Sequence, residues 1–424
     1  MPHAPPHTVA PVQPQESGGL GLALALSLAA VVALGITRFS YGLLLPPMRE
    51  DLGWSYSLAG LMNTFNAIGY LLGALSTPAL MRRCGPGPLL LWSTAVASVC
   101  MVAGGLFTAS GALLGQRLLA GIFSAWIFTA GGLLAARLSL RWPGHSGLLL
   151  GLYYGGAGWG IVLCALSVPA ALQLAGPQAH PWMWAWWILA GWAGAATLVL
   201  VLALRALHRH GIETGPAMPP SASAASSTTS TQNTPSDVVA TAVPWRAFAP
   251  ALLGYSLFGV GYIGYMTFVI ALLRAQGNSD GAITLFYSLL GLAVVASSRL
   301  WAGLLDRHRD GQPLARLNAL LGVATLLPAL TSALPVLVLS GVLFGAVFLS
   351  VVAATTALVR HNLPQAQWAS GISGFTIIFA VGQILGPTVV GWISDGPGGL
   401  ARGLLFSAAA LWLGALLAWR QKSL

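Results

Sequence analysis

The chain has 424 residues, of which 56% are hydrophobic and only 7% are charged. This balance excludes a soluble globular domain and indicates a polytopic membrane protein. The net charge of +10 would suggest nucleic-acid binding in a soluble chain. Here the basic residues fall in short gaps between apolar runs, which indicates membrane orientation and no nucleic-acid partner.

Twelve apolar runs, separated by short polar or Pro/Gly breaks, follow one another along the chain. Each has about the length of helix that crosses a bilayer. Their approximate limits are 20–47, 56–80, 88–108, 110–136, 146–174, 184–206, 247–273, 281–304, 314–333, 335–359, 369–393 and 401–419. We therefore predict an all-α membrane protein with twelve transmembrane helices in two pseudo-symmetric six-helix bundles.

The predicted bundles comprise residues 20–206 and 247–424. Residues 207–246 are rich in Ser, Thr, Ala and Pro and lack apolar periodicity, which predicts a disordered cytoplasmic linker. Residues 1–19 are predicted to form a disordered tail.

A duplication of one six-helix unit is indicated by matches at a shift of 224 residues. This shift places Gly53 and Ser55 on Gly277 and Ser279, and it also aligns two Ser-Gly pairs that start the fifth and eleventh runs. Parallel repeats of this kind are typical of transporters.

The basic residues favour one orientation in the membrane. With the N-terminus in the cytoplasm, thirteen Arg and Lys residues fall in inside segments, and only Arg49, Arg274 and Arg402 fall in outside segments. The positive-inside rule thus predicts a multi-pass protein of the inner (plasma) membrane with both termini cytoplasmic.

Intramembrane arginines are the main candidates for chemistry. Arg38 in the first run lies nine residues before Pro47, about 14 Å along a helix and close to mid-membrane. Such a residue usually faces a bundle interior or an aqueous cavity. A guanidinium binds a carboxylate or phosphate through two parallel hydrogen bonds, so Arg38 and Arg117 predict an anion-binding site. The alternative role of Arg117 is to brace the bundle through backbone carbonyls.

The acidic residues and histidines fall in tails, loops or helix ends. A proton relay in mid-membrane normally uses Asp, Glu or His, and none is available there. The chain also lacks an HExxH motif, a buried acid pair and a Ser-His-Asp set, so we expect neither an enzyme nor a metal site or cofactor.

Polar residues within the runs could either contact substrate or join helices. In the second run Asn63, Asn66 and Tyr70 share one helical face, and Gln383 lies on a similar face of the eleventh. The predicted substrate-binding residues are Arg38, Tyr41, Asn63, Asn66, Tyr70, Arg117, Tyr262 and Gln383.

Two motifs resemble those of the Major Facilitator Superfamily (MFS). Residues 303–307 (GLLDR) are similar to its cytoplasmic loop signature, and residues 117–125 (RLLAGIFSA) to its arginine-glycine motif in the fourth helix. The resemblance implies a rocking pair of six-helix bundles, a central cavity lined by the first and fourth helices, and a cytoplasmic gate. The first-half copy of this signature departs from the family pattern, because Arg82 takes the place of the acidic residue. The predicted gating residues are Arg82, Arg83, Arg299, Asp306 and Arg307.

A narrower resemblance is to the YbfB/YjiJ-type branch of that superfamily. It rests on residues 35–39 (GITRF), 45–48 (LPPM) and 66–73 (NAIGYLLG). The branch is largely without assigned substrates, so this resemblance implies architecture and little chemistry.

We predict a monomeric secondary active or facilitative transporter that moves a small solute, an organic anion held by Arg38, by alternating access. A coupling ion is left open. The alternative within transport is export of lipophilic drugs or metabolites. The alternative from a different class is a membrane sensor that binds its ligand without transporting it.

Overall fold

The computed structural model describes residues 16–212, 214–215 and 243–424. Most of the expected tail and most of the expected linker therefore lie outside the described residues. Helix α1 begins at Glu16, within the segment expected to be a tail, and α7 ends at Arg209, within the segment expected to be a linker.

The described residues before 213 form the N-half, which holds six of the spans. The first span runs through three consecutive helical segments and continues to Leu52, past the prolines at which we expected it to end. The helices are α1 (Glu16–Ala30), the π-helix η1 (Val31–Phe39), α2 (Tyr41–Leu52), α3 (Tyr56–Cys84), α4 (Pro86–Gly104), α5 (Ser110–Arg141), the short η2 (Pro143–His145), α6 (Ser146–Ala175) and α7 (Trp182–Arg209).

The described residues from 243 onward form the C-half, which holds the other six spans. Its helices are α8 (Ala249–Ala275), α9 (Asp280–Leu300), the short α10 (Ala302–Arg307), α11 (Gln312–Leu330), α12 (Leu334–Asn362), the short η4 (Gln365–Gln367), α13 (Trp368–Asp395) and α14 (Gly399–Trp419). Twelve helices of the described chain are long and apolar enough to cross a membrane, as predicted. The fold is all-helical.

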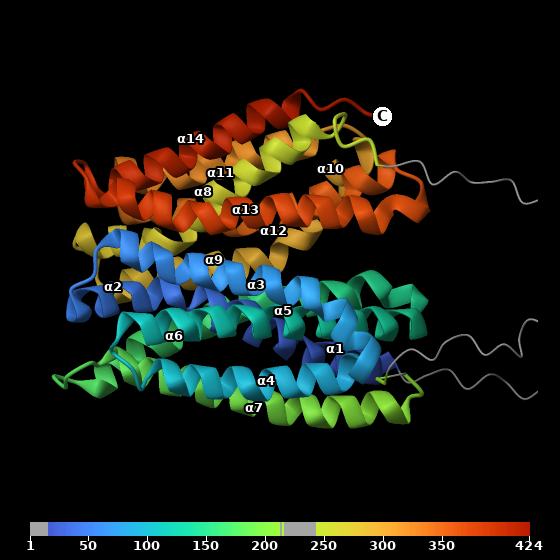
Figure 1. The fold of residues 1–424 in the computed structure, drawn as a ribbon, viewed down its shortest axis with the longest axis horizontal. Coiled ribbons are helices and arrows are strands. Elements are labelled where there is room, and N and C mark those ends of the chain that lie inside the picture. Colours follow the sequence, from blue (N-terminus) through green and yellow to red (C-terminus); the bar gives the residue numbers. More distant parts are fainter. Residues whose placement is uncertain (1–15, 213, 216–242) are drawn as a thin grey trace, which may run out of the picture.

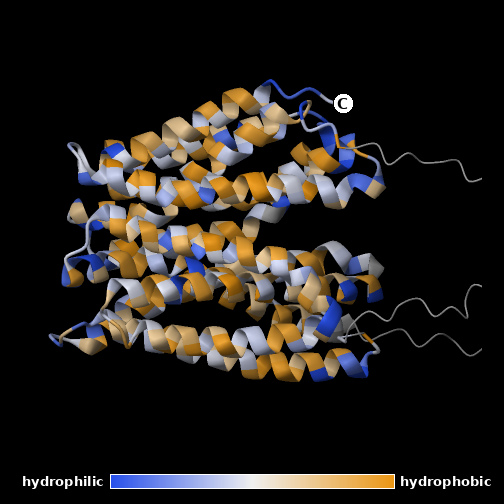
Figure 2. Cartoon of the chain, in the orientation of Figure 1, coloured by the Kyte–Doolittle hydropathy of each residue, from blue (hydrophilic) through white to orange (hydrophobic). Residues whose placement is uncertain are grey.

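The two halves lie side by side with their helices roughly parallel (Figure 1). Apolar residues cover the middle of the helices, and the most polar residues gather towards the two ends of the bundle (Figure 2). We call the end where α3 begins and α13 ends the closed end, and the end where α7 ends and the C-terminus lies the termini end.

The expected duplication is visible in local geometry. Gly53 and Gly277 both have positive φ, 64° and 80°, where a residue without Cβ is favoured. Two residues later, Ser55 and Ser279 each cap the next helix by accepting a hydrogen bond from the backbone N–H three residues on. The same turn therefore joins the first two spans of each half.

Glycines bring the halves into backbone contact. A Cβ on Gly158 of α6 would lie 2.4 Å from the carbonyl oxygen of Gly291 in α9, and one on Gly60 of α3 would lie 2.1 Å from that of Pro387 in α13. Small residues permit this close approach of helices in membranes. The α6–α9 and α3–α13 pairs thus form the seam between the halves.

Candidate functional site

The π-helix η1 positions Arg38 at the seam between the halves. A π-helix leaves its carbonyls without the usual α-helical partners, and such segments are frequent at functional sites. In η1, Thr37 and Ser124 donate their hydroxyls to the carbonyl of Ala33, and Ser40 donates to that of Ile36. Neighbouring side chains therefore satisfy an irregular backbone that apolar surroundings would not tolerate unpaired.

Arg117 of α5 is one of these partners. Its Nη1 donates to the carbonyl of Thr37 at 2.9 Å, and its Nη2 donates to Oδ1 of Asn63 at 3.1 Å. Its guanidinium carbon lies 4.8 Å from the centroid of the Tyr41 ring. All of these partners belong to the N-half, and Arg117 is only 1% exposed. In this conformation its side chain joins α5, η1 and α3.

Arg38 has a different environment. Its Nη2 donates to Oε1 of Gln383 in α13, and its guanidinium carbon lies 5.0 Å from the centroid of the Tyr70 ring. Gln383 in turn donates through Nε2 to the hydroxyl of Tyr262 in α8, at 2.7 Å. Arg38 is 5% exposed, and its Nε has no hydrogen-bond partner. The N-half thus presents a buried cation to two neutral groups of the C-half.

No described carboxylate compensates this charge. The ion pairs of the described chain join His180 to Asp51 and Arg274 to Asp280, and neither involves Arg38. A buried charge without a counter-ion is costly in a low-dielectric interior. Arg38 is therefore a buried charge without a described counter-ion.

Aromatic rings of the C-half form a continuous wall beside this arginine. Tyr262 stacks on Phe348 and Phe379 with ring centroids 5.9 and 5.7 Å apart. Phe39, the neighbour of Arg38, meets Phe348 edge-on at 5.9 Å. The wall comes from α8, α12 and α13, and it supplies apolar area next to a cation.

The other predicted binding residues lie close to the seam but are already hydrogen-bonded. Tyr41 donates its hydroxyl to the carbonyl of Ala59, and Asn66 donates to the carbonyl of Arg117. Asn63 donates to Thr267 of α8 at 2.7 Å, so it bridges the halves while accepting from Arg117. Asn63 and Asn66 of the second span therefore join helices in this conformation.

The predicted gating residues lie at the termini end. Arg82, Arg83, Arg299, Asp306 and Arg307 are all exposed. None of their side chains forms a hydrogen bond or an ion pair with a described residue. In this conformation they do not join the halves.

The closed end is joined by a group that sequence reasoning missed. The carboxylate of Asp395, the last residue of α13, accepts from the backbone N–H groups of Tyr56 and Ser57 at 2.7 and 2.9 Å. It also accepts from the Ser57 hydroxyl. Asp395 thus caps the N-terminus of α3 across the seam, where a negative charge is favoured. The acid could have been noticed from its place at the end of the eleventh span.

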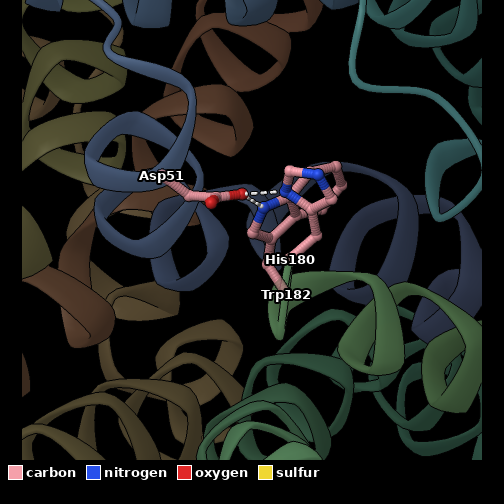
Figure 3. A network of polar contacts seen from close by, with 3 residues as sticks. All are labelled: Asp51, His180 and Trp182. Carbon is pink, nitrogen blue, oxygen red and sulfur yellow. Dashed lines mark hydrogen bonds and ion pairs between the residues drawn. The ribbon is translucent and has the colours of Figure 1, made fainter. Parts of the chain in front are cut away.

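Asp51 forms a second polar cluster at the closed end, within the N-half (Figure 3). Its Oδ2 accepts from Trp182 Nε1 at 2.5 Å and lies 2.5 Å from His180 Nδ1. His180 is the only described non-glycine residue with positive φ, at 58°. The cluster ties the end of the first span to the start of α7. It makes no contact with Arg38.

Metal binding finds no support in the described chain, where no group of three or more His, Cys, Asp or Glu side chains could hold an ion.

The chain is similar to proteins of a known family. The family profile described as "Uncharacterised MFS-type transporter YbfB" matches residues 30–419. No curated protein sequence matches the chain.

Solved structures share the fold at low sequence identity. A bacterial homologue of the human lysosomal transporter Spinster, inward-facing and unoccupied, is similar with a TM-score of 0.70 and 17% identity, over 96% of this chain and 97% of that one. The nucleoside transporter NupG, in a mutant form, gives 0.68 and 13%, over 94% and 99%. The human organic anion transporter MFSD10 gives 0.58 and 16%, over 96% and 100%. At these identities the similarity shows the MFS fold alone.

Proposed function

This chain belongs to the YbfB family of MFS-type transporters, and from that premise we propose that it carries a small organic anion bound at Arg38. It is a multi-pass membrane transporter and not an enzyme. Its substrate is a small molecule, and the proposal concerns the chemical class of that molecule.

The observation that carries the proposal is the buried, uncompensated guanidinium at the seam. Arg38 meets only the neutral amide of Gln383 and the ring of Tyr70 among its described polar and aromatic partners, and its Nε is free. A carboxylate or phosphate would supply the missing charge and could take two parallel hydrogen bonds. Because Gln383 is uncharged, the anion can replace its carbonyl without breaking an ion pair.

The aromatic wall favours an anion with an apolar body. Tyr262 and Phe348 stack beside the arginine and present flat apolar surface, while the Tyr262 hydroxyl already serves as a polar contact. Ligand sites commonly combine such apolar walls with a few placed polar groups. We therefore place the carboxylate on Arg38 and the body of the substrate against Tyr262 and Phe348.

Alternating access follows from the way the halves meet. The hydrogen bonds that cross the seam lie at the level of Arg38 or closer to the closed end, for example those of Asn63, Thr64 and Asp395. At the termini end the exposed gating residues join nothing in the described chain. With both termini in the cytoplasm, the halves would separate first at the cytoplasmic side, and breaking the Asp395 contacts would open the other side.

The second candidate function is export of lipophilic drugs or metabolites. The aromatic wall alone favours it, since stacked rings bind neutral or cationic aromatic molecules without needing Arg38. The two functions therefore differ in their dependence on this arginine.

The test is flux in proteoliposomes of labelled mono- and dicarboxylates, with lipophilic cations beside them, for wild type and Arg38→Gln. Hydrogen bonds to charged groups contribute about 1.5–3 kcal/mol, so carboxylate flux should fall by about ten- to a hundredfold. Arg205→Gln is the matched control, because Arg205 is an exposed arginine at the end of α7.

Carboxylate flux that survives Arg38→Gln would overturn the proposal. Flux of lipophilic cations that persists in the variant, with no carboxylate flux in wild type, would establish the second function instead. Equal thermal midpoints of the two variants and wild type would show that the comparison concerns binding and not folding.

A further inference from the structure

A groove on the C-half lies apart from the seam. It has a volume of about 630 Å³ and opens outward between the break that separates α9 from α10 and the helices α11 and α14. Its lining is almost wholly apolar, with one charged residue: Leu300, Trp301, Leu304, Arg316, Ala319, Leu320, Val323 and Trp412. All of these residues belong to the C-half, so the groove does not depend on how the halves meet.

The aromatic walls of the groove are held in fixed positions. Trp301 donates its indole N–H to the carbonyl of Ala346 in α12 at 2.8 Å, and Trp412 donates to the carbonyl of Ala319 in α11 at 3.2 Å. The Trp412 indole can lie directly on α11 because Gly322 has no Cβ. A Cβ at this position would come within 2.3 Å of the indole Nε1. Hydrogen bonds and a close-contact glycine thus shape the groove.

The groove has a polar mouth and an apolar interior. Arg316 is the fifth residue of α11, and Val323 lies seven residues further, about 10 Å along the helix. The mouth therefore lies near the termini end of the helix, at the depth where lipid headgroups meet the hydrocarbon. The tryptophans suit this depth as well, since indoles are enriched at membrane interfaces.

The charge at the mouth is uncompensated. Arg316 donates through Nη2 to Oε1 of Gln312 at 2.6 Å, and its Nη1 lies 3.5 Å from Nε2 of His308. The nearby Asp310 hydrogen-bonds to Gln312 and forms no described contact with the arginine. Two of the five guanidinium N–H donors are thus engaged, both with neutral or basic partners, and the side chain is exposed.

We propose that this groove binds an anionic phospholipid of the surrounding bilayer. One acyl chain lies along Leu304, Leu320 and Val323 between the two indoles, and the phosphate receives paired hydrogen bonds from Arg316. Basic pockets between transmembrane helices recognise anionic headgroups in this way. A zwitterionic lipid brings its own cation to a mouth that already holds Arg316 and His308, so its binding is weaker.

The experiment is native mass spectrometry of the full chain purified in an equimolar mixture of phosphatidylglycerol and phosphatidylcholine. Wild type should retain phosphatidylglycerol in preference. Arg316→Gln should lower retained phosphatidylglycerol about fivefold, the effect of one basic residue near a membrane surface, and leave phosphatidylcholine unchanged. Ala319→Phe keeps the charge but fills the groove, and it should reduce retention of both lipids.

Arg205→Gln removes an exposed arginine of the N-half and should retain as much lipid as wild type. Equal losses in Arg205→Gln and Arg316→Gln would overturn the proposal, because net charge alone would then explain the binding. Retention without preference between the two lipids, or an Ala319→Phe variant that binds like wild type, would overturn it as well. Thermal melting of each variant verifies that the chain is folded.

Discussion

The two buried arginines of the N-half differ in which half supplies their hydrogen-bond partners. Arg117 bonds to Thr37 and Asn63 and lies over Tyr41, all within its own half. Arg38 bonds across the seam to Gln383, and the Nε of each arginine is unpartnered. Contacts within a half persist while the halves rock, and contacts across the seam must break. The role of a charged residue in the membrane therefore depends more on which half supplies its partners than on its depth.

The largest expected difference between Arg117→Gln and Arg38→Gln is in the stability of the folded chain. Arg117→Gln shortens the side chain and leaves the Thr37 carbonyl and Asn63 Oδ1 without their donors, at a cost of about 1–3 kcal/mol for each buried group. We expect a lower yield and a thermal midpoint several degrees below that of Arg38→Gln, measured by tryptophan fluorescence in detergent. An Arg117→Gln chain that melts like wild type but transports nothing would assign this arginine to the substrate and end the contrast.

A second, smaller effect concerns the closed end. Asp395→Asn replaces one carboxylate oxygen by an amide donor, which repels an N–H at the start of α3 instead of accepting from it. We expect the halves to separate there more often, so that a cysteine at Thr64, which is 7% exposed, reacts severalfold faster with a membrane-impermeant maleimide. The experiment uses a chain in which Cys84, the half-buried native cysteine, is replaced by Ser.

Asp280→Asn is the matched control at the same end. Asp280 pairs with Arg274 within the C-half, so its loss should leave the labelling rate unchanged. If both variants label alike, Asp395 does not hold the halves together.

The smallest effect is expected at Gln383. Gln383→Leu removes the neutral partner of Arg38 but leaves the charge, so we expect a rise in KM of only a few fold with little change in maximal flux. The conservative Gln383→Asn should restore part of the affinity. A loss as large as that of Arg38→Gln would mean that the amide, and not the guanidinium, provides most of the binding energy.

Much of the fold was predictable because membrane helices are defined by length and hydropathy. The twelve runs predicted the twelve spans, and the GLLDR and RLLAGIFSA segments together with residues 35–39 pointed to the family that the profile comparison shows. The end of the first span was less predictable. Its helix continues through Pro46 and Pro47 to Leu52, since proline is more frequent within membrane helices than within soluble ones.

The sequence indicated which residues form the candidate site but not which of them contact one another. Arg38 was named from its charge, Gln383 from its helical face and Tyr262 as an aromatic residue of the seventh run. The structure brings them together, although Arg38 and Gln383 lie 345 positions apart. Phe348 and Asp395 were not foreseen. A phenylalanine in an apolar run carries no signal of its own, and an acid at a helix end is usually a solvated surface residue.

The π-helix that carries Arg38 also sets the helical phase of the first span. A π-turn holds one residue more than an α-turn, and the bond from Ser40 N–H to the Gly35 carbonyl spans five residues. Rewinding it as an α-helix would rotate α1 against α2 by about 100° and lengthen the span by about 1.5 Å. Arg38 stands at the junction of these two segments. A single step of helical phase would therefore turn the cation away from Gln383 while Asp51 keeps the far end of the span anchored.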